Sequence, residues 1–128
     1  LDASAHKVRF HSGGQGPIMH YHASTGTYDW HPATTFPLGY MPQTDLAAPL
    51  ELALAPGDIL GLISDGIYEY ENEVGLQFGQ KGIRSVIDAM PGGKAEELVP
   101  AIMHAARMHG GSAPQADDIT IVLVRRNF

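Results

Sequence analysis

The segment GDILGLISDGIYEYEN, residues 57–72, contains the pattern that decides the fold. Its stretch from Ile59 to Ser64 is apolar or small and does not alternate with polar residues, which predicts a strand buried on both faces. The predicted strand leads directly into Asp65 and Gly66. An ordinary buried strand would exit through neutral turn residues, so this carboxylate is a candidate functional group.

The chain before this segment has the patterns of β-strands. Residues 6–12 alternate, and residues 17–24 and 27–32, joined by a Thr-Gly turn, predict a hairpin. Residues 50–55 alternate again, and the Pro-Gly-Asp at 56–58 predicts a turn from them into the buried strand. We therefore expect a second hairpin there, with a proline-rich loop between the two hairpins.

The chain after this segment predicts two helices and a closing strand. Apolar residues recur at helical spacing in two runs: Ile83, Val86, Ile87 and Met90 in the first, and Leu98, Ile102, Ala105 and His109 in the second. Pro100 predicts a kink in the second helix. Residues 116–126 predict a strand whose Ile119, Ile121 and Leu123 share one face with Asp117. Strands, then helices, then a strand favour a layered α+β fold in which the helices cover one face of a sheet.

Asp65 and Asp117 stand at the ends of two predicted strands. If those strands are antiparallel neighbours, both carboxylates emerge at the same rim of the sheet. Two close carboxylates repel each other unless a cation lies between them, and Mg²⁺ or Mn²⁺ suits such oxygen ligands. The alternative is that Asp-Gly is an ordinary turn and that Asp117 or Asp118 only begins a strand or caps a turn.

Composition excludes several classes of protein. Eight basic and fourteen acidic residues give a formal net charge of −6, and no Lys/Arg-rich stripe is present, so nucleic acid is not an expected partner. The 128 residues contain no cysteine, which excludes disulfide frameworks and thiolate metal sites. No apolar run approaches the roughly 20 residues that span a bilayer. The first residues resemble neither a signal peptide nor a natural start, so we expect a piece of a larger protein in the cytoplasm, or in the cytoplasmic part of a membrane-anchored sensor.

The segment at residues 56–79, followed by two helices and then by ADDITIVLVRR at 116–126, resembles the metal-dependent protein serine/threonine phosphatases of the type-2C superfamily. The similarity is to the C-terminal half of the domain in the bacterial branch typified by the stage II sporulation E phosphatase. It implies an antiparallel β-sandwich flanked by helices, with Asp carboxylates holding two Mg²⁺ or Mn²⁺ ions at one end. By position, Asp65 and Asp117 resemble metal ligands. Gly66, Glu69 and Asp118 would lie beside them, and no catalytic residue is implied beyond a metal-activated water.

Two departures from the family pattern bear on activity. The acidic motifs that supply the family's other metal ligands have no counterpart here, so we expect a single phosphatase domain over residues 1–128 that is incomplete at its N-terminus. We expect the isolated chain to be inactive. In addition, Gln15 of GGQGP stands where many members have His in Gly-His-Pro.

The resemblance implies hydrolysis of phosphoserine or phosphothreonine on a regulatory phosphoprotein, of the kind represented by anti-sigma-factor antagonists. An upstream sensory or receiver domain would control the activity. The alternative is a non-catalytic regulatory or protein-binding module with the same fold. Unpaired sheet edges would also invite pairing with another chain, which makes a homodimer an expected state.

Other side chains are weaker candidates. His20 and His22 have a spacing found in zinc sites, but no third ligand is evident, so we expect a solvated hairpin face. The same argument applies to His104 and His109. Tyr68, Tyr70 and Trp30 are interpreted as packing residues, and Glu69 and Glu71 either hold metal-bound waters or form a solvated acidic turn.

Overall fold

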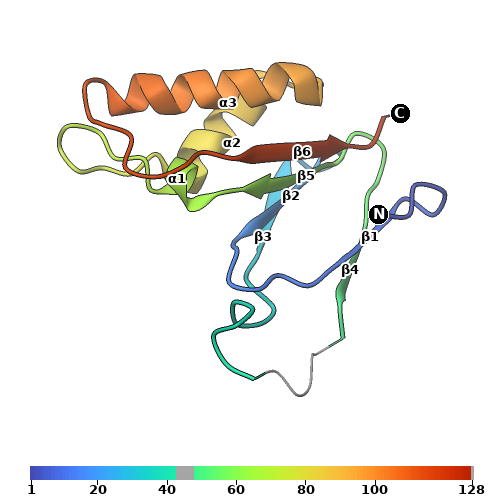
Figure 1. Ribbon diagram of the computed structural model, residues 1–128. Helices are drawn as coiled ribbons and strands as arrows, with labels where there is room; N and C mark the ends of the chain where they lie inside the picture. Colours follow the sequence, from blue (N-terminus) through green and yellow to red (C-terminus); the bar gives the residue numbers. More distant parts are fainter. Residues whose placement is uncertain (43–47, 128) are drawn as a thin grey trace. The chain divides into compact units, whose positions relative to one another are not determined.

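The structure is a computed structural model that describes residues 1–42 and 48–127. Within these residues strands come first, helices follow and a strand ends the order, as the sequence predicts (Figure 1). The elements are β1 (Lys7–Phe10), β2 (Ile18–His22), β3 (Thr27–His31), β4 (Leu50–Ala53), β5 (Ile59–Ile63), α1 (Asp65–Tyr68), α2 (Gly79–Ala89), α3 (Ala95–Gly110) and β6 (Ile121–Arg125).

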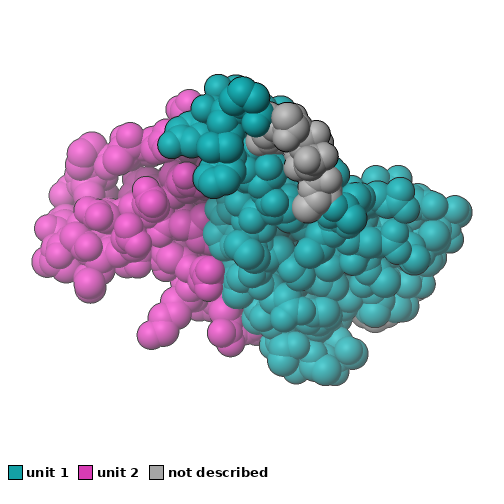
Figure 2. Space-filling view, turned by 90° about the horizontal axis from the view of Figure 1, so that it is seen from below, with its two compact units in different colours: residues 1–61, 125–128 teal, residues 62–124 magenta. Residues whose placement is uncertain are grey.

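The chain divides into two compact units, coloured teal and magenta in Figure 2. The first contains residues 1–61 and the residues from Arg125 on, and the second contains residues 62–124. None of the helices in the described residues is long and apolar enough to cross a membrane.

The first unit is built from antiparallel strand pairs. β2 and β3 form the predicted hairpin, with His20 opposite Asp29, and β2 also pairs with β5. β1 pairs with β4, from Lys7 opposite Ala53 to Phe10 opposite Leu50. The strand order is β1-β4 in one sheet and β3-β2-β5-β6 in the other.

The predicted hairpin between β4 and β5 is therefore wrong, because the two strands belong to different sheets. The Pro-Gly-Asp turn is present, with the Asp58 amide donating to the Ala55 carbonyl at 3.0 Å. Within this turn, the Gly57 amide donates to the Arg126 carbonyl and not back to β4. The burial patterns explain the separation: β4 alternates between half-buried and exposed residues, whereas four of the five β5 residues are buried.

The second unit holds the helices. α2 and α3 pack against each other and lie on the same side of β6 (Figure 1). α2 buries Ile83 and Ile87, as the sequence predicts. α3 buries Leu98 and Ile102 and then continues with Ala106 and Gly110, so the predicted Ala105 and His109 lie beside the buried stripe. Small residues at the end of this stripe let neighbouring segments approach the helix closely.

β5 and β6 are antiparallel neighbours, as predicted. At one end of the pair the Arg126 amide donates to the Asp58 carbonyl at 3.0 Å. At the other end the Ser64 amide donates to the Thr120 carbonyl at 2.9 Å. Residue numbers rise along one strand as they fall along the other, which is the antiparallel register.

Candidate functional site

Ser64 fixes the end of β5 against the segment that enters β6. Its amide donates to the Thr120 carbonyl at 2.9 Å, and its hydroxyl both accepts the Thr120 amide at 2.8 Å and donates to the Asp118 carbonyl at 3.1 Å. Because Asp65 directly follows Ser64 and Asp117 directly precedes Asp118, both candidate ligands lie at the same end of the strand pair. The predicted common rim is confirmed.

Gly66 brings the two segments into close contact. It is buried, and a Cβ placed on it would collide with the carbonyl oxygen of Asp118 and lie 3.2 Å from that of Asp117. Glycine at position 66 therefore allows the backbone after Asp65 to pack directly against the Asp117–Asp118 peptide. The chain continues into α1, a single helical turn in place of the turn expected from the sequence.

The two carboxylates at this rim are exposed. In the described residues no hydrogen bond or ion pair engages the Asp65 carboxylate. The Asp117 carboxylate accepts the amide of Asp118 through Oδ1 at 2.7 Å, which orients the group. Beneath them Tyr68 is buried, and burial together with the negative charge of Asp65 raises the pKa of its hydroxyl, so this side chain stays neutral.

A cavity of about 380 Å³ opens beside the rim. Three of the predicted site residues, Gly66, Glu69 and Asp117, line it, and Glu71 contributes a further carboxylate. The remaining lining residues are Tyr70, Asn72, Gln77, Ala113, Pro114 and Ala116. Asp65 and Asp118 adjoin lining residues in the sequence and are not part of the wall. The wall of the cavity thus carries three carboxylates, those of Glu69, Glu71 and Asp117.

The donor set fits a hard divalent cation, because exposed carboxylate oxygens are the ligands that Mg²⁺ and Mn²⁺ prefer. It is also incomplete. Where the structure describes the chain, neither Asp65 nor Asp117 belongs to a group of three close metal-ligating side chains. Two carboxylates supply only part of the roughly six ligands around such an ion.

The histidine interpretation needs a correction. His20 was expected on a solvated hairpin face, but it is only 3% exposed and its Nε2 lies 3.2 Å from Oδ2 of the buried Asp58. The hairpin pattern placed His20 and His22 on one face, but no local signal indicated that a carboxylate 38 positions away would pair with them. The sequence predicts Asp58 as a turn residue and gives no sign of its pairing with His20.

The other side chains singled out in the sequence lie at the surface or in packing contacts. His104 is exposed on α3, and His109 Nε2 lies 2.8 Å from the Leu76 carbonyl. Gln15 is exposed. Trp30 stacks on Tyr28, and Tyr70 lines the cavity while its ring lies against Gly110.

Comparison with known proteins places this architecture in a family. The family model described as Stage II sporulation protein E (SpoIIE) matches residues 1–127. The chain belongs to this family. No curated protein sequence matches it significantly.

Solved structures with the same fold as this SpoIIE-family chain include phosphatase domains. The SiaA-PP2C domain of Pseudomonas aeruginosa superposes with a TM-score of 0.80 at 20% identity, covering 98% of this chain and 49% of that one. The PP2C phosphatase domain of Bacillus subtilis SpoIIE, with a fragment of its regulatory domain, gives 0.74 at 22%, covering 99% and 37%. A manganese-presoaked structure of the B. subtilis phosphatase domain gives 0.69 at 18%, covering 99% and 54%.

These similarities confirm the predicted α+β fold with antiparallel sheets and helices. This chain spans about half, or less, of the solved structures that it matches.

Proposed function

We propose that this chain is the C-terminal portion of a single phosphatase domain, and that the complete domain hydrolyses phosphoserine or phosphothreonine on a regulatory phosphoprotein. The observation that carries the proposal is the common rim, where Asp65 and Asp117 are held at one end of the β5–β6 pair by the hydrogen bonds of Ser64. Family membership and the PP2C fold of the solved relatives support it.

In this proposal Asp65 and Asp117 hold Mg²⁺ or Mn²⁺, with two ions in the complete site. Ions held there would supply positive charge that offsets the charge of a phosphate group and lowers the pKa of water. The manganese-presoaked relative supports the choice of metal.

The chain's own residues prepare this site in different ways. Asp65 offers a carboxylate with no competing partner in the described residues, and the Asp118 amide orients that of Asp117 at 2.7 Å. Asp118 therefore acts through its backbone. Glu69 and Glu71 on the cavity wall can accept hydrogen bonds from water. Gly66 lets the Asp117–Asp118 peptide pack closely against the segment that carries Asp65.

The proposed substrate is a phosphoprotein of the anti-sigma-factor-antagonist type, and an upstream sensory or receiver domain would regulate the activity. The acidic wall of the cavity and the net charge of −6 both repel a phosphorylated surface. Substrate binding should then depend on the divalent ions, because they supply the local positive charge. Cytoplasmic location is part of the same proposal.

The test compares two neighbouring substitutions in the complete domain. We expect Asp117→Asn to lower kcat on a phosphoserine protein at saturating Mn²⁺ by more than the roughly 10–100-fold that loss of an outer partner of a metal ligand costs. Asp118→Asn should retain activity within a factor of about 10, because its contribution is a backbone amide that the substitution keeps. Equal losses in the two variants would contradict the assignment of Asp117 as a ligand.

The second candidate is a non-catalytic module that binds a partner protein. It is favoured by one observation: the described part of the chain brings only two candidate carboxylate ligands to the rim. A complete domain that binds a phosphoprotein but does not hydrolyse it with either Mn²⁺ or Mg²⁺ would support this alternative.

A further inference from the structure

One face of the β2–β3 hairpin gathers side chains that ligate metals. In the antiparallel register His20 lies opposite Asp29, His22 opposite Thr27 and His31 opposite Ile18. Paired residues project to the same side of a sheet and alternate residues share a face, so the three histidines and Asp29 lie on one face.

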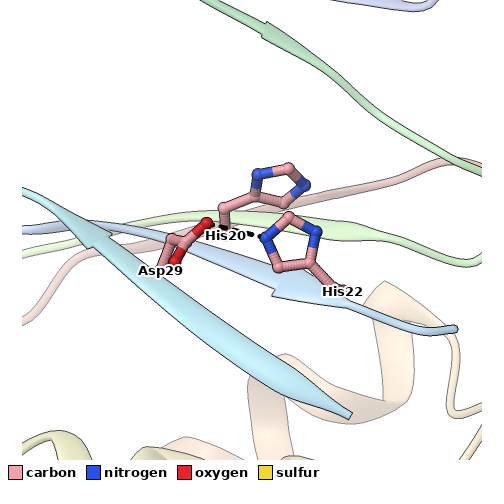
Figure 3. A group of neighbouring side chains, drawn as sticks. All are labelled: His20, His22 and Asp29. Atoms are coloured by element: carbon pink, nitrogen blue, oxygen red, sulfur yellow. Dashed lines mark hydrogen bonds and ion pairs between the residues drawn. The ribbon is translucent and has the colours of Figure 1, made fainter. Parts of the chain in front are cut away.

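The side chains on this face are close enough to share an ion. One ligand atom from each of His20, His22 and Asp29 lies within 4.8 Å of the others. Figure 3 shows the Asp29 carboxylate reaching from β3 toward the ring of His22 on β2, where His22 Nε2 and Asp29 Oδ2 are 2.8 Å apart. The ring centroids of His20 and His22 are 4.0 Å apart.

The buried carboxylate of Asp58 orients the ring of His20. Asp58 is 2% exposed, and it accepts the amides of Ala23 and Ala55, each at 2.9 Å. Its Oδ2 lies 3.2 Å from His20 Nε2 and 3.9 Å from His22 Nδ1. A carboxylate that fixes one nitrogen of an imidazole while the other stays available is the usual arrangement around metal-ligating histidines.

A fourth group remains unsatisfied nearby. The Nε2 atom of His31 is buried and has no hydrogen-bond partner in the described residues, and the His31 ring centroid is 6.3 Å from that of His20. Buried polar atoms are nearly always paired, so this ring nitrogen calls for a partner that the described residues do not supply.

The carboxylates at this face have histidines as their partners. In the described residues the side-chain contacts of Asp29 and Asp58 that bring opposite charges together are with histidines alone.

We propose that His20, His22 and Asp29 form a Zn²⁺ site, with Asp58 as the positioning residue of His20. Two imidazoles and a carboxylate are ligands that Zn²⁺ takes in proteins, whereas Mg²⁺ and Mn²⁺ prefer oxygen ligands throughout. This site shares no residue with the Asp65–Asp117 rim and differs from that rim in its preferred metal.

The test is calorimetric titration of this chain with ZnCl₂ in a phosphate-free buffer containing an excess of MgCl₂. We expect one Zn²⁺ per chain. His22→Ala and Asp29→Asn should each weaken binding by at least about 10-fold. Both residues are less buried than His20, so these variants should fold, and circular dichroism checks this. His104→Ala, which removes an exposed histidine of α3, and Asp65→Asn should bind Zn²⁺ as the unaltered chain does.

A second readout reports the ligands directly. Co²⁺ in place of Zn²⁺ should give the visible absorption of a tetrahedral site, and this absorption should be lost in folded His22→Ala. The proposal is overturned if the folded chain binds no Zn²⁺. It is also overturned if His22→Ala and Asp29→Asn bind Zn²⁺ as tightly as His104→Ala, because dispersed surface histidines would then explain the binding.

Discussion

Gly66 shows how one missing side chain can position a functional rim. Its backbone lies so close to the Asp117–Asp118 peptide that any side chain would displace one of the two segments. The requirement is spatial, since Gly66 is not one of the glycines with positive φ. The separation of the two candidate ligands thus depends on a residue that carries no chemistry of its own.

We predict that Gly66→Ala destabilises the chain by about 1–3 kcal/mol, the usual cost of forcing atoms into a packed region. In the complete domain the same variant should need more Mn²⁺ for half-maximal activity. Urea unfolding and a metal titration measure the two effects. Gly16→Ala is the control, because its new methyl group would lie 3.5 Å from the nearest atom. Similar stabilities for the two variants would contradict the close-packing argument.

Asp58 is a second residue whose loss should be costly. Asp58→Ala removes the acceptor of two part-buried backbone amides and the buried partner of His20. Leaving a buried group unpaired costs about 1–3 kcal/mol and the two amides add to this, so we predict a loss of at least about 2 kcal/mol in unfolding free energy.

Urea unfolding in EDTA at neutral pH measures this loss, and Asp29→Ala is the exposed control. Because the pKa of Asp58 is lowered in the folded chain, its contribution is fully present at neutral pH and declines as the pH falls below its ordinary value of 3.8. An Asp58→Ala variant as stable as Asp29→Ala would contradict the prediction.

The strands and helices differ in how far the sequence predicts them. The buried run at Ile59 to Ser64 and the alternating run before Arg125 predicted β5 and β6. The prediction of their antiparallel pairing, and therefore of the common rim, rested also on the family resemblance. The pairing of β4 with β1 was not predictable from the sequence, because the short turn between β4 and β5 suggested that these two strands pair with each other. Burial of His20 was missed because its partner, Asp58, is brought to it by the strand pairing of β2 with β5.

β6 is an edge strand with an apolar face. The pairing of Ser64 with Thr120 places Leu62, 39% exposed, opposite Val122, 49% exposed. Neighbouring apolar side chains on a sheet edge favour association with a second strand. This pair is a candidate contact for the homodimer that the sequence analysis predicts.

We predict that Val122→Lys weakens self-association of the chain by about 10-fold or more, which corresponds to about 1.4 kcal/mol. A lysine on an edge strand opposes pairing with another strand. Sedimentation equilibrium measures the change. Val74→Lys is the matched control, since Val74 is 77% exposed outside any strand. A monomeric unaltered chain, or equal effects of the two lysines, would remove β6 as the contact.

For the molecule as a whole, charge is the property that governs its proposed partner. The chain is acidic overall, and Glu69, Glu71 and Asp117 line the cavity beside the rim. A phosphorylated protein brings further negative charge to this surface. Divalent ions are therefore expected to affect binding as well as chemistry.

We predict that EDTA weakens binding of a phosphorylated partner to the complete domain by about 10-fold or more, because chelation removes about 1.4 kcal/mol or more of favourable charge interaction. Titration calorimetry with and without EDTA measures this. The unphosphorylated partner is the control and should bind equally in both buffers. Binding of the phosphorylated form that is unchanged by EDTA, together with no turnover, would favour the non-catalytic module.

The hydrogen bonds of Ser64 have an evolutionary consequence. They hold the rim through backbone groups of Thr120 and Asp118 and through one hydroxyl, and no carboxylate takes part in them. Mutations that erase the acidic side chains would leave this geometry intact. A descendant of such a domain could lose the proposed phosphatase activity and still keep this fold. Active and inactive members of a family can therefore diverge by a few substitutions at this rim while every intermediate stays folded.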